Sequence, residues 1–325
     1  MKAILVRAFG GPEVLELANL PAPRPGPGQV VVRLMAAGVN PVDTYIRSGS
    51  YGRLPELPYT PGTDGAGVIF AVGSGVPPSV QAGQRVWVSG SLGGTYAESA
   101  LCEAGQVHPL PDGVSFSQGA ALGIPYTTAC RALFQRGGGK TGETVLIHGA
   151  TGGVGVAAVQ FARAAGLHVV ATGGSDAGRA MLAGAGVAEV FDHGLPDYPE
   201  AVLRATGGKG VDLILEMLAN QNLPKDLTML ARFGRIVVVG SRGPVEIHPR
   251  DIMVRDADIR GLVVFNAPAP ELAECHAAID AGLRAGTLAP VIGMEFGLGE
   301  ASAAHRFLME AGHRGKIVLR CAELG

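Results

Sequence analysis

A glycine-rich segment, Gly-Ala-Thr-Gly-Gly-Val-Gly at residues 149–155, has the composition and spacing of a loop that binds phosphate groups. Glycines let the backbone turn tightly and approach a pyrophosphate, while the N-terminus of a following helix presents free N–H groups and a positive dipole end. In the G-x-G-x-x-G pattern, Ala150 replaces the first glycine, and Gly152 and Gly155 occupy the other two positions. The chemistry that this segment favours is therefore the binding of a dinucleotide.

The residues around the loop supply the context that such a motif requires. An apolar strand, residues 144–148, runs into the loop, and a segment of helical periodicity, residues 154–165, leads out of it. A second apolar strand is predicted at residues 168–172. A glycine-rich loop without a ligand is the alternative, but a strand, loop, helix and strand in this order are typical of a dinucleotide-binding unit.

The end of the second strand indicates which nicotinamide cofactor to expect. Enzymes that use NAD usually carry Asp or Glu there, to hold the ribose 2′-hydroxyl. Residues 171–175 are Ala-Thr-Gly-Gly-Ser, so no acid at the tip repels a 2′-phosphate. Asp176 is interpreted as a dipole partner in the first turn of the next helix. Arg179 is the candidate ligand of the 2′-phosphate, with a solvated surface arginine as the alternative. NADPH is the predicted cofactor.

Length, composition and charge set limits on the class of protein. The 325 residues predict two domains, and the 47% of apolar residues are enough for a sizeable core. The net charge of −2, with bases scattered along the chain, argues against nucleic acid as a partner. The sequence contains no run of about 18 apolar residues, so no membrane span is predicted. Residues 1–7 are predicted to form a strand rather than a signal peptide, so a cytoplasmic location is expected.

The cysteines are spaced too widely for a framework of disulfides or a four-cysteine zinc lobe. None of them forms a C-x-x-C pair, and the prediction is that all are free thiols, buried or half-buried. The four residues are Cys102, Cys130, Cys275 and Cys321.

The elements that must position the loop fall into two patterns. In the first third, short strands at residues 30–36, 67–72 and 85–89 alternate with Gly and Pro, which predicts a β-rich, partly closed barrel. From about Gly123, apolar strands alternate with helical segments, which predicts a parallel sheet covered on both faces. The strands expected in this second part are residues 144–148, 168–172, 187–191, 211–216, 235–240 and 260–265.

The last part of the chain is predicted to contain one helix, residues 270–285, and a closing strand, residues 316–320, at a sheet edge. The fold class expected is α/β, with a β-rich domain beside a doubly wound parallel-sheet domain. The change of pattern places the start of the second domain at residue 123.

Several segments beyond the loop resemble the zinc-independent quinone oxidoreductases of the medium-chain dehydrogenase/reductase superfamily, and within them the ζ-crystallins. The similarity extends over nearly the whole chain. The segments that begin at Glu216 and Val239 are more specific than the superfamily pattern. The matching segments are residues 38–49, 57–64, 123–129, 149–155, 216–220, 239–243 and 249–251.

This resemblance implies a GroES-like catalytic domain made from both chain ends, residues 1–122 and 266–325, with a Rossmann domain, residues 123–265, inserted between them. It implies that Tyr45 lies beside the nicotinamide. Similar proteins often bind the 2′-phosphate through a Lys after the second strand, where this chain has Gly178. The implied contacts are Thr151, Gly152, Gly153 and Val154 to the pyrophosphate; Gly174, His193 and Asn222 on the adenosine side; and Val239, Gly240, Ser241, Arg242, Leu262, Val263 and Val264 to the ribose and nicotinamide.

The positions that hold zinc in other branches of the superfamily carry no soft ligands here. Asn40 and Gly62-Thr63-Asp64 stand where those branches need Cys and a His-Glu pair. The expectation is therefore an enzyme without a metal ion. The scattered histidines lack ligand spacing, and His148, before the loop, is expected to be a packed structural residue.

A quinone is already an electrophile, so its reduction needs mainly that it be held face to face with the nicotinamide. Tyr45 is the candidate to orient a carbonyl oxygen or supply a proton, and Asn40 to donate a hydrogen bond to the same oxygen. Thr127 is the candidate for binding the nicotinamide carboxamide. The alternatives are packing for Tyr45, a local turn for Asn40 and the start of a helix for Thr127.

Two other functions stay open on the sequence. A 2-enoyl thioester or other α,β-unsaturated carbonyl reductase shares the scaffold and NADPH, but residues 40–47 and 216–220 favour the quinone branch. Some ζ-crystallins resemble this chain and serve as structural or RNA-binding proteins, yet no basic surface with aromatic residues is apparent here. The family also implies a homodimer or homotetramer.

Overall fold

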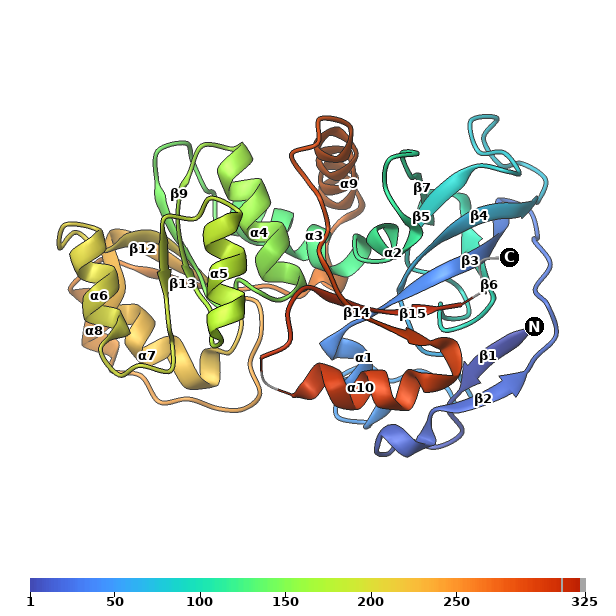
Figure 1. Cartoon of the computed structure of the whole chain (residues 1–325), viewed down its shortest axis with the longest axis horizontal. Helices are drawn as coiled ribbons and strands as arrows, with labels where there is room; N and C mark the ends of the chain where they lie inside the picture. Colours follow the sequence, from blue (N-terminus) through green and yellow to red (C-terminus); the bar gives the residue numbers. More distant parts are fainter. Residues whose placement is uncertain (311, 322–325) are drawn as a thin grey trace. The chain divides into compact units, whose positions relative to one another are not determined.

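The computed structural model describes residues 1–310 and 312–321, and their contacts divide the chain into two units (Figure 1). Unit 1 consists of Met1–Ile124 and Ala289–Gly325, so both chain ends belong to it. Unit 2 is the continuous segment Pro125–Leu288 between them. The chain therefore has one unit inserted into the other.

The second boundary differs from the expected one at residue 265. Helix α9 (Ala269–Arg284) belongs to unit 2. The reason is a set of polar contacts to the turn of π-helix at Arg131–Arg136. The Arg131 guanidinium donates to the Glu271 carboxylate at 2.7 Å and to the Val263 carbonyl at 3.2 Å. These contacts tie α9 to the helical segment that opens unit 2.

Unit 2 contains a parallel sheet with the strand order β10-β9-β8-β11-β12-β13. Numbered from β8, this order is 3-2-1-4-5-6, that of the Rossmann fold, in which ligands bind beyond the carboxyl ends of the strands where the order reverses. The strands are β8 (Thr144–Ile147), β9 (His168–Thr172), β10 (Glu189–Phe191), β11 (Val211–Glu216), β12 (Leu230–Val238) and β13 (Asp258–Gly261).

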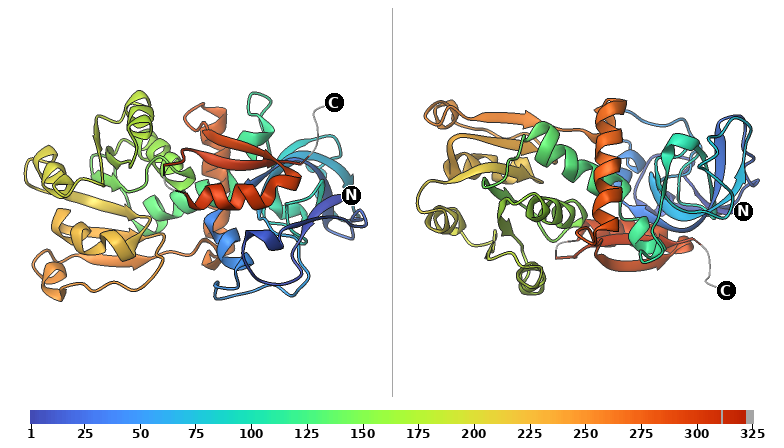
Figure 2. Two further views of the ribbon diagram at one scale, coloured as in Figure 1. Left: turned by 60° about the horizontal axis from the view of Figure 1, so that its bottom comes forward. Right: turned by 90° about the horizontal axis from the view of Figure 1, so that it is seen from above.

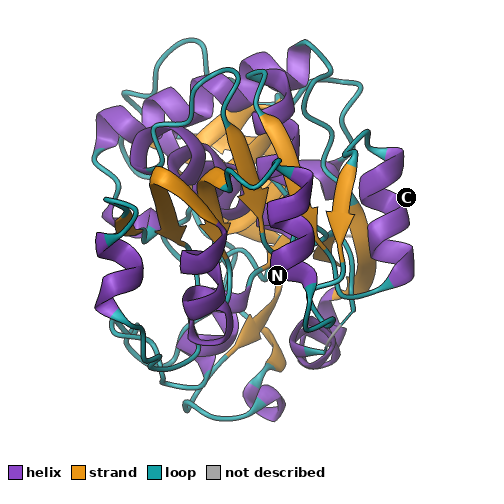
Figure 3. Ribbon diagram, turned by 90° about the vertical axis from the view of Figure 1, so that its left-hand side faces the viewer, coloured by secondary structure: helices purple, strands orange, loops and turns teal. Residues whose placement is uncertain are grey.

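Helices cover both faces of this sheet, as predicted from its near-continuous apolar strands. In Figure 3 the strands lie between helices. On one face, Leu146, Val170 and Ile214 pack into a core with α6 and α7. The alternate residues of the same strands, such as Val145 and Leu213, are buried as well. The helices of unit 2 are α3, which begins in unit 1 (Gly123–Cys130), α4 (Gly153–Ala164), α5 (Asp176–Gly184), α6 (Tyr198–Ala205), α7 (Ala219–Met229), α8 (Pro249–Met253) and α9.

Unit 1 is built around one long strand, β3 (Gln29–Val39), which pairs with β4, β6 and β15. Strand β15 (Lys316–Arg320) is antiparallel to β3 and parallel to β14, so the prediction that it is an edge strand is wrong. The pairing joins the two ends of the chain within one sheet (Figure 2). The other strands are β1 (Lys2–Leu5), β2 (Glu16–Asn19), β4 (Asp64–Val72), β5 (Arg85–Ser89), β6 (Ser99–Glu103), β7 (Val107–Pro109) and β14 (Ile292–Gly297).

The core of unit 1 lies inside this curved sheet and beneath helix α10 (Ala301–Met309). Helices α1 (Pro41–Arg47) and α2 (Phe116–Gly119) complete the unit. The prediction for the cysteines is confirmed: Cys102, Cys130, Cys275 and Cys321 are all buried and free. Among the described helices, none combines the length and apolar character needed to cross a membrane.

Candidate functional site

The glycine-rich loop lies between β8 and α4, as expected from the sequence. Gly149 has a φ of 54°, a left-handed conformation that favours glycine. A Cβ on Gly155 would lie 2.5 Å from the Cα of Ala150, so this position also requires glycine. Ala150, in contrast, is completely buried and its N–H donates to the Thr172 carbonyl at 3.1 Å. An alanine at this position of the fingerprint is thus accommodated without strain.

The part of the loop expected to contact a pyrophosphate is the part left accessible. Residues 151–154 are all partly exposed, whereas Gly155 behind them is buried. Gly152 is the N-cap of α4 and has no side chain to occupy the free N–H groups of the first turn. The geometry therefore offers backbone donors and a helix N-terminus to an anion.

The tip of β9 lies next to this loop and is lined by glycines. A Cβ on Gly178 would lie 2.8 Å from the Thr151 side chain, and one on Gly174 would lie 2.9 Å from the His193 ring. The expected adenosine-side residues Gly174 and His193 are thus brought together. Partial burial, followed by the nearby His148, lowers the pKa of the His193 imidazole.

Arg179 reaches back to the tip of β9, but its guanidinium is already paired. It donates to the Gly173 carbonyl at 2.9 Å and forms ion pairs with Asp192 at 2.8 Å and with Asp176. Asp192 is only 25% exposed, whereas Asp176 is almost fully exposed at 98%. A 2′-phosphate at this place would therefore compete with Asp176 for the guanidinium.

The other residues of unit 2 that are expected to contact the cofactor lie at the same carboxyl ends of the strands. Val239 donates to the Glu216 carbonyl at 2.8 Å, and Arg242 donates through its N–H to the Asn220 side chain at 2.8 Å. The Glu216 carboxylate accepts from the Asn222 amide at 3.1 Å. Gly240 packs against the Met217 carbonyl so closely that a Cβ would overlap it. Ser241 belongs to the same turn, and Leu262, Val263 and Val264 follow β13, the Leu262 N–H donating to Val238.

Thr127 lies in α3, with 2% of its surface exposed. Its hydroxyl has no hydrogen-bond partner among the described residues. A buried hydroxyl without a partner costs free energy, so this atom fits a ligand group such as a carboxamide. The role of Thr127 stays a prediction.

In unit 1, Tyr45 and Asn40 belong to the same short helix, α1. Asn40 is its N-cap, and its backbone N–H donates to the Asp43 carboxylate at 2.8 Å. Tyr45 is partly exposed, and within the described part of the chain its hydroxyl makes no hydrogen bond. The phenol is thus available to a substrate. Asn40, in contrast, is 2% exposed, and its catalytic role stays a prediction.

The side chain of Asn40 takes part in a buried cluster that the sequence analysis missed. Its amide donates to Asp64 at 2.9 Å, and its oxygen accepts from the Lys316 ammonium. Lys316 also pairs with Asp64 at 3.2 Å, and burial lowers the pKa of its ammonium group. Burial raises the pKa of the neighbouring Asp43 carboxyl to about 7. The Lys316 amino group therefore contacts both Asn40 and Asp64, and the three side chains form one buried polar cluster.

Comparison with known proteins agrees with this geometry. Residues 26–112 match the family model of the alcohol dehydrogenase GroES-like domain, and residues 153–280 match that of the zinc-binding dehydrogenase. The quinone oxidoreductase of Rattus norvegicus is 47% identical over 321 residues, which cover 98% of this chain and 97% of that protein.

Two solved structures show the same fold over nearly the full length. An NAD-dependent alcohol dehydrogenase superposes with a TM-score of 0.92 at 32% identity and covers 99% of this chain and 100% of its own. The Escherichia coli quinone oxidoreductase, solved as a complex with NADPH, superposes with a TM-score of 0.89 at 28% identity and covers 98% and 100%. With near full-length identity of 47% to a quinone oxidoreductase, the chain belongs to the quinone oxidoreductase family of GroES-like and Rossmann-fold dehydrogenases.

Proposed function

We propose that the protein is an NADPH-dependent quinone reductase that transfers reducing equivalents to small quinones, ortho-quinones among them. The observation that carries this proposal is the 47% identity to a quinone oxidoreductase over 98% of the chain. The accessible loop at residues 151–154, at the end of a Rossmann sheet, supports it independently because that edge offers donors to an anion.

The residues of unit 2 fit NADPH in the following way. Thr151, Gly152, Gly153 and Val154 would hold the pyrophosphate, and Gly174, His193 and Asn222 the adenosine. Arg179 would hold the 2′-phosphate, which displaces Asp176 while Asp192 keeps the guanidinium in place. Val239, Gly240, Ser241, Arg242, Leu262, Val263 and Val264 would flank the ribose and nicotinamide.

The chemistry that NADPH supplies when bound is a hydride. The chain's own contribution is to orient the substrate and handle a proton. Tyr45 is proposed to donate its phenolic hydrogen to a quinone oxygen, and the unpaired Thr127 hydroxyl to fix the carboxamide. Asn40 has one amide hydrogen left for the same quinone oxygen, since the other is donated to Asp64.

We propose that no zinc takes part. The Asp64 carboxylate is paired with the Lys316 ammonium and so needs no metal ion to balance its charge. Neither Asn40 nor Asp64 offers zinc a soft ligand. A quinone needs no Lewis acid to become electrophilic.

We also propose a cytoplasmic homodimer or homotetramer that associates through the outermost strand of the unit 2 sheet. Strand β13 lies at that edge, and the side chains that follow it include Val263 and Phe265, which are 43% and 50% exposed. An unpaired strand edge with exposed apolar side chains is suited to pair with a second copy.

A direct test measures NADPH oxidation with 1,2-naphthoquinone and, separately, with crotonyl-CoA. The proposal predicts turnover of the quinone, undiminished after dialysis against a zinc chelator, and none of the thioester. Turnover of the thioester alone would assign the protein to the enoyl reductases instead. Replacement of Tyr45 by Phe should lower kcat by about 100-fold or more if the phenol supplies a proton.

A further inference from the structure

Three ionisable side chains are buried together where the strand order of the unit 2 sheet reverses. His148 directly follows β8, Glu216 ends β11, and Asp226 projects from α7. Their side chains are 2%, 0% and 0% exposed. The expectation that His148 is a packed structural residue did not include its two carboxylate neighbours.

The contacts within this cluster leave two carboxylate oxygens unpaired. His148 Nε2 is hydrogen-bonded to the Asp226 Oδ1 at 2.8 Å, and His148 Nδ1 is hydrogen-bonded to the Thr172 hydroxyl at 3.1 Å. Glu216 Oε2 lies 3.6 Å from Nε2, beyond hydrogen-bond distance. Glu216 Oε2 and Asp226 Oδ2 have no other partner in the described part of the chain. Two buried carboxylates cannot both stay ionised without a counter-charge.

One proton held between the carboxyl groups resolves this conflict. Burial, and then the neighbouring Asp226, raises the pKa of Glu216 to about 7, and burial does the same for Asp226. Burial lowers the pKa of His148, so the imidazole stays neutral rather than taking up the charge.

Among the other titratable or charged groups around the cluster, Lys225 is a positive charge that acts against the raised pKa of Asp226, but burial is the larger effect and the pKa stays raised. The Tyr198 ring from α6 packs edge-on against His148, and burial raises the pKa of its phenol. Lys225 on α7 lies over the outer side of that ring, 5.5 Å from its centroid. His193, beyond β10, stays neutral because its pKa is also lowered.

A metal ion fits these residues less well than a proton. The three side chains offer one nitrogen and two carboxylates, and their burial leaves no solvent to complete a coordination shell of four or more ligands. The Nε2 atom of His148 is already engaged in a hydrogen bond with Asp226.

The cluster is joined to the proposed cofactor site through Glu216. Its Oε1 accepts from the Asn222 amide at 3.1 Å and from the Leu218 N–H. Because a carboxylate oxygen only accepts, the amide nitrogen of Asn222 must face inward. The carbonyl oxygen of Asn222, a partly exposed residue, is then left for a ligand that donates, such as a ribose hydroxyl or the adenine amino group.

We propose that Glu216, supported by His148 and Asp226, is a positioning residue that fixes the Asn222 amide for the dinucleotide, and that one proton shared in the cluster keeps it in place. The inference rests on the proposed function, since it assigns a partner to the same cofactor site. Loss of the shared proton would set two buried negative charges side by side and displace Glu216 from Asn222 and Leu218.

The test is the dissociation constant of NADPH, measured by fluorescence between pH 7 and pH 9.5, where the 2′-phosphate is already fully ionised. In the wild type, binding should weaken about fivefold or more over this range. In Glu216→Gln the side-chain amide stands in for the protonated acid, so affinity at pH 7 should stay near that of the wild type and the pH dependence should disappear. Asp226→Asn should flatten the profile in the same way.

A double-mutant cycle separates positioning from general stability. Glu216→Ala and Asn222→Ala should each weaken NADPH binding about tenfold, and the double variant should be scarcely weaker than either single one. Glu143→Gln, at the other end of the sheet, should keep the wild-type pH profile. A Glu216→Gln profile that still follows the wild type, or additive losses in the cycle, would overturn the inference while leaving NADPH binding intact. Absence of NADPH binding by the wild type would instead refute the proposed function.

Discussion

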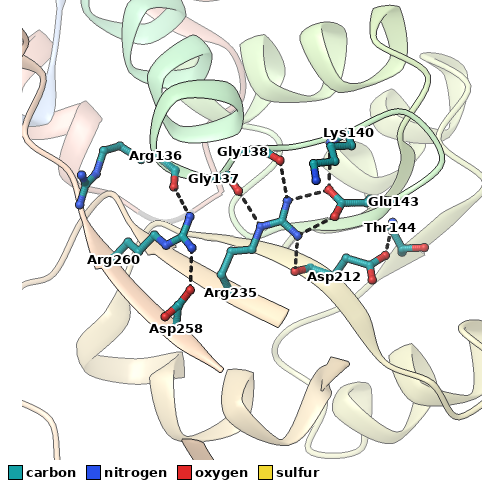
Figure 4. A network of polar contacts seen from close by, with 10 residues as sticks. All are labelled: Arg136, Gly137, Gly138, Lys140, Glu143, Thr144, Asp212, Arg235, Asp258 and Arg260. Atoms are coloured by element: carbon teal, nitrogen blue, oxygen red, sulfur yellow. Dashed lines mark hydrogen bonds and ion pairs between the residues drawn. The ribbon is translucent and has the colours of Figure 1, made fainter. Parts of the chain in front are cut away.

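The two ends of the unit 2 sheet both carry buried polar groups, but they satisfy them in opposite ways. Near the amino ends of β8 and β11, Arg235 donates all five of its N–H groups: to the carbonyls of Gly137, Gly138 and Asp212 and to both oxygens of Glu143 (Figure 4). The guanidinium and the carboxylate balance in charge. No N–H group of Arg235 is therefore free to bind a ligand.

The carboxyl ends of the same strands are left incomplete. The His148, Glu216 and Asp226 cluster has two unpaired carboxylate oxygens, and the loop at residues 151–154 presents free backbone donors. Ligands bind at this edge in sheets of this topology. The contrast indicates that a fully hydrogen-bonded network stabilises the amino end of the sheet. At the carboxyl end, the unpaired carboxylate oxygens and the free backbone N–H groups are available to a proton and to the cofactor.

The largest expected effect removes the satisfied network. Arg235→Leu leaves Glu143 and three carbonyls without their donor, and should lower the free energy of unfolding of unit 2 by about 3 kcal/mol. The affinity of the folded protein for NADPH should change less than about twofold, because the site lies at the other end of the strands. Chemical denaturation and NADPH titration check the two halves of this prediction.

The matched control is Arg260→Leu. Arg260 is 36% exposed and pairs with Asp258, which is 61% exposed. Exposed pairs contribute about 0–1 kcal/mol, so this variant should unfold nearly as the wild type does. Equal losses for the two variants would contradict the structural role given to the Arg235 network.

The next effect concerns the incomplete end. Gly155→Ala places a Cβ 2.5 Å from the Ala150 Cα, which forces the N-terminus of α4 away from the loop. NADPH binding should weaken by about 100-fold, since a shift of about 1 Å in a binding element has costs of this order. The control Gly184→Ala, in α5, meets open space and should leave binding unchanged. Isothermal titration with NADPH measures both variants. Equal affinities for Gly155→Ala and Gly184→Ala would contradict the role given to the loop.

A third effect of comparable size concerns the dependence of stability on pH. The pKa of Glu216 is about 7 in the folded protein and 4.5 in the unfolded chain. Between these values the unfolded chain releases a proton that the folded protein keeps, so the free energy of unfolding falls as pH rises and stays low above pH 7.

Glu216→Gln has no such proton to lose. Its Tm relative to the wild type should therefore rise between pH 5 and pH 8, by roughly 2–4 °C for each kcal/mol involved. Glu143→Gln serves as the control without a raised pKa. A constant difference in Tm between Glu216→Gln and the wild type across this range would show that the carboxyl groups do not share a proton.

Much of this arrangement could be predicted from the sequence. The glycine-rich loop, its flanking strands and the helix that follows have local signals: apolar runs, a change of period and glycines where the backbone needs them. The family resemblance added predictions for residues on the adenosine and nicotinamide sides of the cofactor. The predicted residues that belong to unit 2 lie together at the carboxyl ends of its strands.

The parts that could not be predicted depend on contacts between distant segments. The assignment of α9 to unit 2 follows from the ion pair between Arg131 and Glu271, which no local pattern reveals. The interior position of β15 depends on its pairing with β14. Lys316 gave one signal that was overlooked: it is one of five lysines in the chain and stands in an apolar strand.

The same holds for the cluster behind the loop. His148 directly follows β8 and Glu216 ends β11, and a polar residue at the end of a largely apolar strand is a readable signal, but only the fold shows that these two strands are neighbours. Asp226 lies in a helix of mixed polarity and gave no signal at all. The pairing of Arg179 with Asp192 was equally hidden, because it needs the pairing of β9 with β10, whereas Asp176 lies three residues before Arg179 in the same helix.

The central claim is that the carboxyl edge of unit 2 binds NADPH, and the most direct test is nucleotide selectivity. Wild-type protein, Arg179→Ala and Asp176→Asn are titrated with NADPH and with NADH. The account predicts that the wild type binds NADPH at least about tenfold more tightly than NADH, since a charge-assisted pair contributes about 1.5–3 kcal/mol. Arg179→Ala should lose this preference, and Asp176→Asn should increase it by removing the competing carboxylate. A wild type that prefers NADH, or equal losses for both nucleotides in Arg179→Ala, would contradict the account.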